Sequence, residues 1–131
     1  MEKEFIPYEQ AVDLKELGYN RKCLGQFNTH QGDKWLFSID LSGEGQYPSN
    51  SRACLAPTFS QAFRWFREKY NEHTILIPYC DSSGKVLSYR FEIVVQDYNL
   101  DDFESECKDY TYEEAELECL KKLIEIVKEQ K

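Results

Sequence analysis

The chain has 131 residues, of which 41% are hydrophobic and 15% aromatic, and it carries a formal net charge of −8. This length predicts a single domain, 1–131, and the aromatic share is enough to build a core, which excludes low-complexity disorder for its body. The negative charge disfavours contact with phosphate, so we expect neither direct nucleic-acid binding nor binding to an anionic membrane surface.

The cysteines and the chain start indicate the compartment. No apolar leader follows Met1, and no apolar run reaches the roughly 18 residues that a membrane span needs. The five cysteines are odd in number and include no C-x-x-C pair. We therefore expect a cytoplasmic protein with reduced thiols, most of them small core side chains, and only Cys107 exposed.

The first third of the chain predicts a helix and a hairpin. Pro7 suits the first position of a helix over Pro7–Leu17, and Gly18 suits its C-terminal stop. Strands over 22–29 and 34–40 flank a turn-rich connection at 30–33. The inner face of the helix is formed by Ala11, Leu14 and Leu17, and we expect Ile6 to pack just before the helix.

The middle of the chain predicts a second helix and a second hairpin. Thr58 and Gln61 form a capping box at the start of the helix. Strands over 73–80 and 85–96 follow, joined by a turn at 81–84, and Pro78 either marks the first of them as an edge strand or ends it. In the second strand one face alternates with the other, and we expect the apolar face to pack on helices: Leu87, Tyr89, Phe91, Ile93 and Val95 against Ser88, Arg90, Glu92 and Gln96. The apolar face of this helix comprises Phe59, Ala62, Phe63, Phe66 and Tyr70.

A third helix closes the chain, giving an α+β fold in the order αββαββα. Thr111 and Glu114 form its capping box. We expect the two β-hairpins to form one four-stranded antiparallel sheet with the helices packed mainly on one face. The buried stripe of the last helix is Ala115, Cys119, Leu120, Leu123, Ile124 and Val127.

An acidic segment precedes and enters this helix. Residues 97–118 hold ten carboxylates and one base, Lys108. One interpretation is a solvated loop that keeps the protein in solution, with the charges near the helix start favoured by its dipole. The other is a surface for a basic protein partner, centred on Asp101, Asp102, Glu104 and Glu106.

No pattern in the chain reaches a catalytic, metal or cofactor signature. His30 and His73 lie far apart without paired cysteines, the glycines of 42–45 lack a phosphate-loop context, and the acidic loop lacks the calcium-loop pattern. A thiol among Cys23, Cys54 and Cys80 could meet a histidine in space, although a packed thiol is the simpler interpretation. We expect no cofactor, no metal and no catalytic residue.

One face of the second helix combines basic and aromatic residues. Arg64, Trp65 and Arg67 lie off the phenylalanine stripe, and arginine and tryptophan are frequent anchors of protein interfaces. This pattern predicts a partner-binding surface on the helix. The alternative is that Trp65 covers the rim of the sheet.

Three stretches carry a resemblance to a known family: Ile6–Ala11 with Lys15–Gly18, Ala56–Tyr70 and Tyr112–Lys128. They resemble small proteins of phages and prophages of gut Bacteroidales-type bacteria. They cover the three helices and leave the hairpins unmatched. Because the family has no assigned activity, the resemblance implies only a phage-related accessory role inside a bacterial host cell.

Three hypotheses about function follow. The first is a non-catalytic adaptor or inhibitor that binds a host or phage protein, as a monomer or small homo-oligomer. The second is a small-molecule or nucleotide binder that uses a pocket between sheet and helices. The third is a small enzyme with a Cys/His or carboxylate site.

Overall fold

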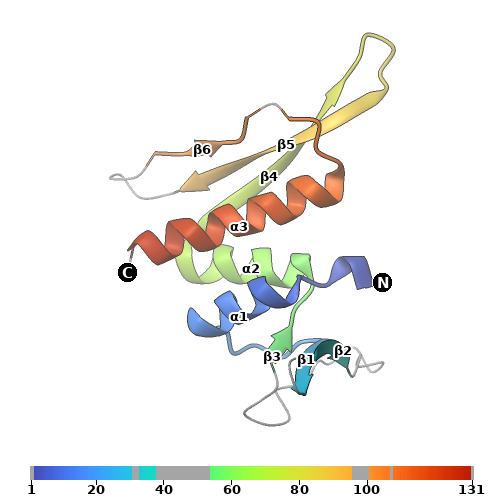
Figure 1. The fold of residues 1–131 in the computed structure, drawn as a ribbon. Helices are drawn as coiled ribbons and strands as arrows, with labels where there is room; N and C mark the ends of the chain where they lie inside the picture. The colour runs from blue at the N-terminus through green and yellow to red at the C-terminus, as the bar shows by residue number, and fades with distance from the viewer. Residues whose placement is uncertain (1, 31–32, 38–53, 96–100, 107, 131) are drawn as a thin grey trace. The chain divides into compact units, whose positions relative to one another are not determined.

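A computed structural model describes residues 2–30, 33–37, 54–95, 101–106 and 108–130. The fold is α+β, as predicted, with helices and antiparallel sheets (Figure 1). The chain divides into two compact units, Met1–Ala62 and Phe63–Lys131. Within the described ranges, no helix has the length and apolar character to cross a membrane.

The first unit holds a short 3-10 helix, α1 and one sheet. The 3-10 helix covers Glu2–Glu4 and α1 covers Tyr8–Glu16. Pro7 is extended at ψ 157° and is the N-cap residue, so α1 begins one residue later than predicted, and Gly18 follows the helix with φ 97°. The predicted inner face and the packing of Ile6 are confirmed, since Ile6, Ala11, Leu14 and Leu17 are all buried.

The sheet of this unit has the strand order β2-β1-β3, with both pairings antiparallel. Its strands are β1 (Gly25–His30), β2 (Asp33–Phe37) and β3 (Cys54–Ala56). A Cβ on Gly25 would lie 3.0 Å from the Phe5 ring and 3.2 Å from Leu36. Glycine at this position therefore allows Phe5 and Leu36 to pack closely against the β1 backbone. The Leu41–Asn50 loop lies outside the described residues.

Helix α2 (Phe59–Tyr70) begins in the first unit and ends in the second. The predicted capping box is confirmed: the Thr58 N–H donates to Gln61 Oε1 at 2.9 Å, and the Gln61 N–H donates to Thr58 Oγ1 at 3.2 Å. Asn71 follows the helix with φ 56°, a conformation that asparagine tolerates, and turns the chain directly into the next strand.

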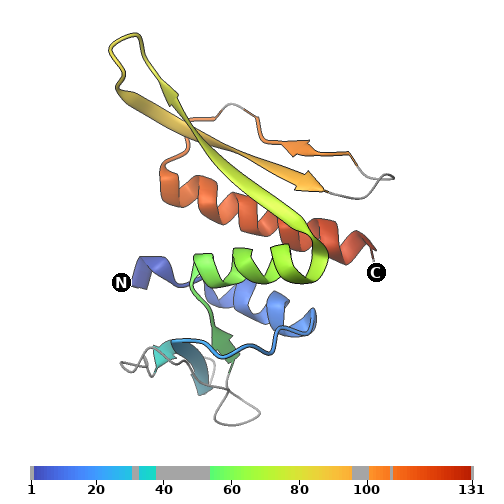
Figure 2. The same ribbon diagram turned by 180° about the vertical axis from the view of Figure 1, so that it is seen from behind.

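The second unit holds the sheet β4-β5-β6 and helix α3, which lies across one face of that sheet (Figures 1 and 2). The strands are β4 (Glu72–Cys80), β5 (Val86–Val95) and β6 (Phe103–Glu104), and α3 covers Tyr112–Gln130. The Thr111 and Glu114 capping box is confirmed at 3.1 and 3.2 Å. All six residues of the predicted stripe on α3 are buried.

The single four-stranded sheet is a wrong prediction, because the described strands form two separate three-stranded sheets. Each hairpin gains its third strand from a short segment. β3 pairs with β1, and β6 pairs with β5. These segments have only three and two residues, too short for a visible alternation of apolar and polar residues.

Candidate functional site

The predicted surface on α2 is not assembled as expected. Trp65 is only 2% exposed, so the prediction that it faces outward with the arginines is wrong. Its ring meets those of Phe66 and Tyr70 edge to face, with centroids 5.2 and 5.5 Å away. Trp65 follows buried Ala62 by three positions, so the two residues lie on neighbouring parts of the helix surface. The buried face of α2 is therefore wider than the phenylalanine stripe and includes Trp65.

The two arginines remain on the surface of α2. Both are exposed, and Arg64 Nε lies 3.0 Å from Glu68 Oε1, one helical turn further on. An exposed pair of this kind stabilises the helix by about 0.3–0.5 kcal/mol. The arginines therefore present charge without an adjacent exposed tryptophan.

The acidic segment is partly a strand rather than only a loop. Asp101, Asp102, Glu104 and Glu106 are all exposed, and Glu104 belongs to β6. Asp102 Oδ1 accepts a hydrogen bond of 3.0 Å from the Val95 N–H of β5. Asp97 and Cys107 lie outside the described residues. Strand pairing thus attaches the acidic residues to the edge of the second sheet.

The register of that sheet fixes which side chains share a face. Phe91 and Ile93 of β5 are buried on the side of α3, and α3 contacts both β5 and β4. Alternate residues therefore form the opposite face, which we call the outer sheet face. It comprises His73, Ile75, Ile77 and Tyr79 of β4, Ser88, Arg90, Glu92 and Val94 of β5, and Glu104 of β6.

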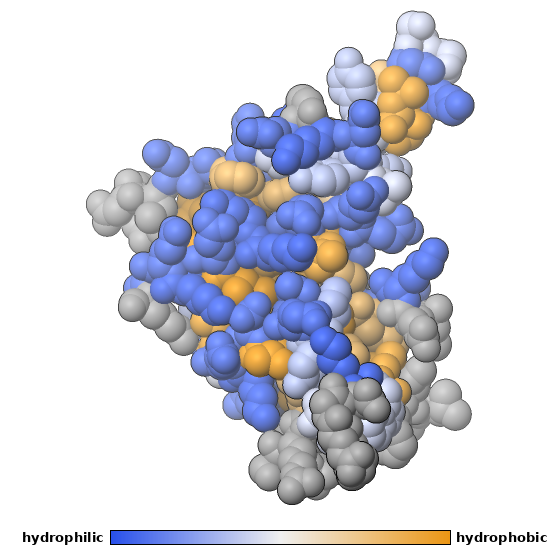
Figure 3. All heavy atoms as spheres, viewed as in Figure 1, coloured by the Kyte–Doolittle hydropathy of each residue, from blue (hydrophilic) through white to orange (hydrophobic). Residues whose placement is uncertain are grey.

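Exposed apolar side chains gather on the β4–β5 hairpin. Ile75 is 45% exposed, Tyr79 60% and Leu87 55%. The hairpin continues past the end of α3 (Figures 1 and 2), and the space-filling view shows hydrophobic atoms on its projecting end (Figure 3). The prediction that Leu87 lies on a packed face is therefore wrong, because Leu87 lies beyond Tyr89, which pairs with Tyr110 just ahead of the start of α3.

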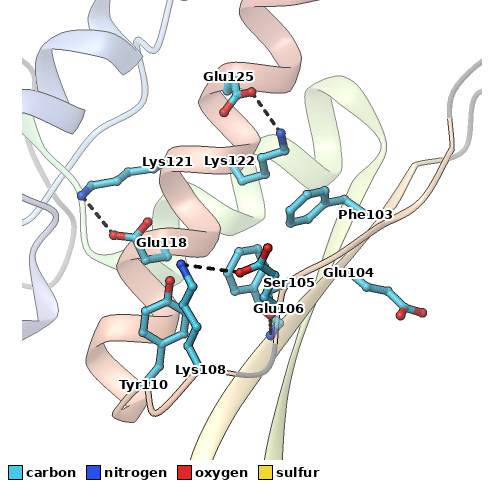
Figure 4. Close-up of a pocket in the computed structure, with 11 residues that line it drawn as sticks. Phe103, Glu104, Ser105, Glu106, Lys108, Tyr110, Glu118, Lys121, Lys122 and Glu125 are labelled. Atoms are coloured by element: carbon cyan, nitrogen blue, oxygen red, sulfur yellow. Dashed lines mark hydrogen bonds and ion pairs between the residues drawn. The ribbon is translucent and has the colours of Figure 1, made fainter.

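A groove of about 420 Å³ lies between α3 and strands β5 and β6. Phe91 and Phe103 stack at its base with centroids 5.8 Å apart, and Lys122 Nζ lies 4.6 Å from the centre of the Phe103 ring. Figure 4 shows Lys122 extending from α3 toward the Phe103 ring, and Glu104 directed away from α3.

Each lysine of this groove has a carboxylate beside it. Nζ–Oε distances are 3.2 Å for Lys121 with Glu118, 3.0 Å for Lys122 with Glu125, and 3.8 Å for Lys108 with Glu106. An anionic ligand would have to compete with these pairs. The groove therefore has the size of a ligand site, but its charges are balanced rather than convergent on one sign.

Two further hollows occur in the second unit. One of about 520 Å³ lies beside the groove, and its walls include Asp101, Asp102 and Phe103. Another of about 270 Å³ is bordered by Tyr79, Ser88 and Arg90 of the outer sheet face, together with Tyr89, Lys108 and Asp109.

The three buried thiols show no sign of activation. Cys23, Cys54 and Cys119 are buried, and burial raises the pKa of Cys23 to about 11 and that of Cys119 to about 12. Burial also raises the pKa of Cys54. Such thiols are poor nucleophiles at neutral pH. Cys80 is exposed, which corrects the expectation that only Cys107 would be.

Metal-ligating side chains are not grouped in the described ranges: no cluster of three or more His, Cys, Asp or Glu residues there is arranged to hold an ion. His73 Nε2 lies 3.1 Å from Asn71 Oδ1, a local contact at the start of β4.

Sequence reasoning missed the outer sheet face as a unit. The alternation along β5 does place Ser88, Arg90 and Glu92 on one side, as predicted. The apolar residues of β4 join them only through the register, and both faces of β4 are apolar at Ile75–Ile77.

No family, curated protein or solved structure matches this chain.

Proposed function

We propose that this chain is a non-catalytic protein-binding module, an adaptor or inhibitor of another protein. The observation that supports this most is the exposure of apolar side chains on one hairpin. Of the six large apolar residues that are exposed in the described part of the chain, four lie on β4 and β5: Ile75, Tyr79, Val86 and Leu87. Ile75 and Tyr79 share the outer sheet face, and apolar side chains exposed together on one face are typical of interaction surfaces.

The surface proposed for the contact is therefore the β4–β5 hairpin rather than the helix. Trp65 is buried, which leaves Arg64 and Arg67 without the aromatic neighbour that an interface anchor would use. Tyr79 supplies an exposed aromatic ring on a strand instead. The resemblance of the three helices to phage and prophage proteins supports a phage or host protein as the partner, in a bacterial cytoplasm.

Site-specific photocross-linking in the cells that make the protein tests this proposal. A photoreactive amino acid is placed at Tyr79, at Arg64 or Arg67, and at Glu16, an exposed residue of α1 that serves as the control. We expect a discrete protein adduct from Tyr79 and none from Glu16. Adducts from the α2 positions alone would support a protein-binding module but place its binding surface on α2 rather than on the hairpin. No adduct from any position would contradict the proposal.

The groove between α3 and the sheet supports the alternative, a small-molecule binder. Its volume of about 420 Å³ and its stacked rings suit a planar ligand. The paired lysines weigh against an anion. A metabolite screen by thermal shift, with Lys122→Ala as the matched variant, distinguishes the two: a ligand whose stabilisation disappears in Lys122→Ala would favour the groove.

A further inference from the structure

The outer sheet face is ordered into rows of different chemistry. β4 contributes an apolar row of Ile75, Ile77 and Tyr79. β5 contributes Arg90 and Glu92, whose side chains form an ion pair at 3.3 Å. β6 adds Glu104 on the far side. The face therefore changes from apolar to acidic across its width.

Two carboxylates lie directly opposite one another in this face. Glu92 and Glu104 are register partners on β5 and β6. Like charges in this arrangement destabilise a sheet. Arg90 is already committed to Glu92, and Glu104 is exposed with no ion-pair partner among the described residues. A cation supplied from outside would relieve the repulsion between them.

The open edge of β4 does not suit an added strand. The Tyr89 N–H donates to Tyr110 O at 3.0 Å, on the side of the sheet away from β4. Pro78 is the register partner of Tyr89. The backbone nitrogen and carbonyl of Pro78 therefore point away from β5, to the side of β4 that no described strand covers. Proline has no N–H to donate, so the edge is interrupted where its side chains are most exposed.

Resting on the proposed function, we propose that the outer sheet face receives an amphipathic basic α-helix of the partner protein. Neighbouring strands are about 4.8 Å apart, so the β4 and β6 rows are about 10 Å apart. This matches the diameter of an α-helix with its side chains, about 10–12 Å. A helix along the strands sets its apolar stripe on the β4 row and its lysine or arginine flank beside Glu92 and Glu104.

The hollow of about 270 Å³ gives such a helix one place to anchor. Tyr79 and Arg90 of the outer sheet face are among its walls. Interfaces draw most of their affinity from a few large side chains seated in pockets. A bulky apolar residue at the end of the helix stripe fits this position.

A displayed library of helical peptides is the probe. Leucines are fixed at i, i+3, i+4 and i+7, and the flanking positions are randomised among Lys, Arg, Glu, Gln and Ser. We expect selection on the full chain to enrich lysine and arginine on one flank. Selected peptides should bind Glu104→Lys about fivefold to tenfold more weakly, since charge reversal replaces an attraction with a repulsion. Tyr79→Ser should weaken them at least as much.

Glu129→Lys is the matched control, because it makes the same charge change at an exposed position of α3. Equal weakening by Glu129→Lys would show long-range attraction only and overturn the proposal. Enrichment of acidic or neutral flanks, or failure to enrich any peptide sensitive to Tyr79→Ser, would also overturn it. So would sedimentation showing that wild type, but not Tyr79→Ser, forms a dimer. If photocross-linking captures a partner but the library enriches no basic flank, the protein-binding module is supported and only the basic helix as its ligand is ruled out.

Discussion

Gln130 Nε2 donates a hydrogen bond of 3.2 Å to Glu72 Oε1, and so joins the last residue of α3 to the first residue of β4. Glu72 is 1% exposed, and its other carboxylate oxygen has no partner in the described part of the chain. The nearby Tyr70 hydroxyl is also buried without a partner there. Burial raises the pKa of Glu72, while the bond from Gln130 lowers it in part.

Replacing Glu72 with Gln should flatten the dependence of stability on pH. An acid with a raised folded-state pKa binds more protons in the folded state than in the unfolded one. Its contribution to stability is therefore complete below the ordinary pKa of 4.5 and is lost as the pH rises through the folded-state pKa. Melting temperatures of wild type and Glu72→Gln, measured from pH 4 upward, should diverge with the variant the more stable at neutral pH.

The control for this prediction is Glu129→Gln, one residue before Gln130 and exposed. Its melting profile should follow that of wild type across the same pH range. A Glu72→Gln variant that melts below wild type at neutral pH would show that the carboxylate is solvated or paired in solution.

Truncation of Trp65 to Ala should destabilise the protein by about 3–5 kcal/mol, the usual cost of removing a large buried ring. Trp65 is 2% exposed and contacts two other aromatic rings. The loss is a large part of the total of about 5–15 kcal/mol that a domain has. Urea denaturation measures it, with Arg67→Ala as an exposed control expected to change stability by less than about 0.5 kcal/mol. Equal midpoints for the two variants would contradict this prediction.

The sequence predicted the elements whose signals are local. Capping boxes at Thr58 and Thr111 and the stripe of α3 depend on residues three or four positions apart, and the structure confirms them. The sheets depend on pairing between distant segments. β3 and β6 become strands only because β1 and β5 offer them an edge, so their pairing was not visible beforehand.

For the candidate surface too, the sequence predicted what depends on local spacing and missed what depends on distant segments. Helical spacing placed Arg64 and Arg67 outward correctly but could not tell how wide the buried arc of α2 is, and Trp65 fell inside it. The outer sheet face needed the register that sets Ile75 opposite Glu92 and Glu92 opposite Glu104. A period-two pattern gives the two faces of one strand, and it does not say which residues of another strand join them.

Cys80 should react with a thiol reagent in the native protein, whereas Cys23, Cys54 and Cys119 should react only after unfolding. Cys80 is exposed, and the other three are buried with raised pKa values. The measurement is a timed titration with an aromatic disulfide at pH 8, in a Cys107→Ser background. One fast thiol is expected, absent from the Cys107→Ser, Cys80→Ser double variant. Two or more fast thiols in the native state would contradict the burial.

Phe103 holds β6 against the sheet. Its ring stacks on Phe91 and lies beneath Lys122 Nζ. Ser105 adds two bonds of 2.9 Å to the backbone of Phe91, donating from its N–H and accepting at Oγ. β6 has only two residues, so these contacts, rather than a long ladder of backbone hydrogen bonds, keep Glu104 beside Glu92.

Phe103→Ala should therefore release β6 while leaving the β4–β5 pairing and α3 intact. The amide of Phe91 donates to Ser105 Oγ and that of Val95 to Asp102 Oδ1, so both should exchange with solvent faster in the variant. The amide of Ile77, whose register pair with Arg90 is hydrogen-bonded between β4 and β5, should keep its rate. Phe103→Leu is the matched control: it keeps an apolar side chain in place but loses the ring stacking on Phe91 and the cation–π contact with Lys122, the latter worth about 0.5–1 kcal/mol. If the proposed helix binds at the outer sheet face, Phe103→Ala should also weaken its binding about as much as Glu104→Lys does, because Glu104 is no longer held beside Glu92. Unchanged exchange at Phe91 and Val95 would show that β6 is held by something other than Phe103.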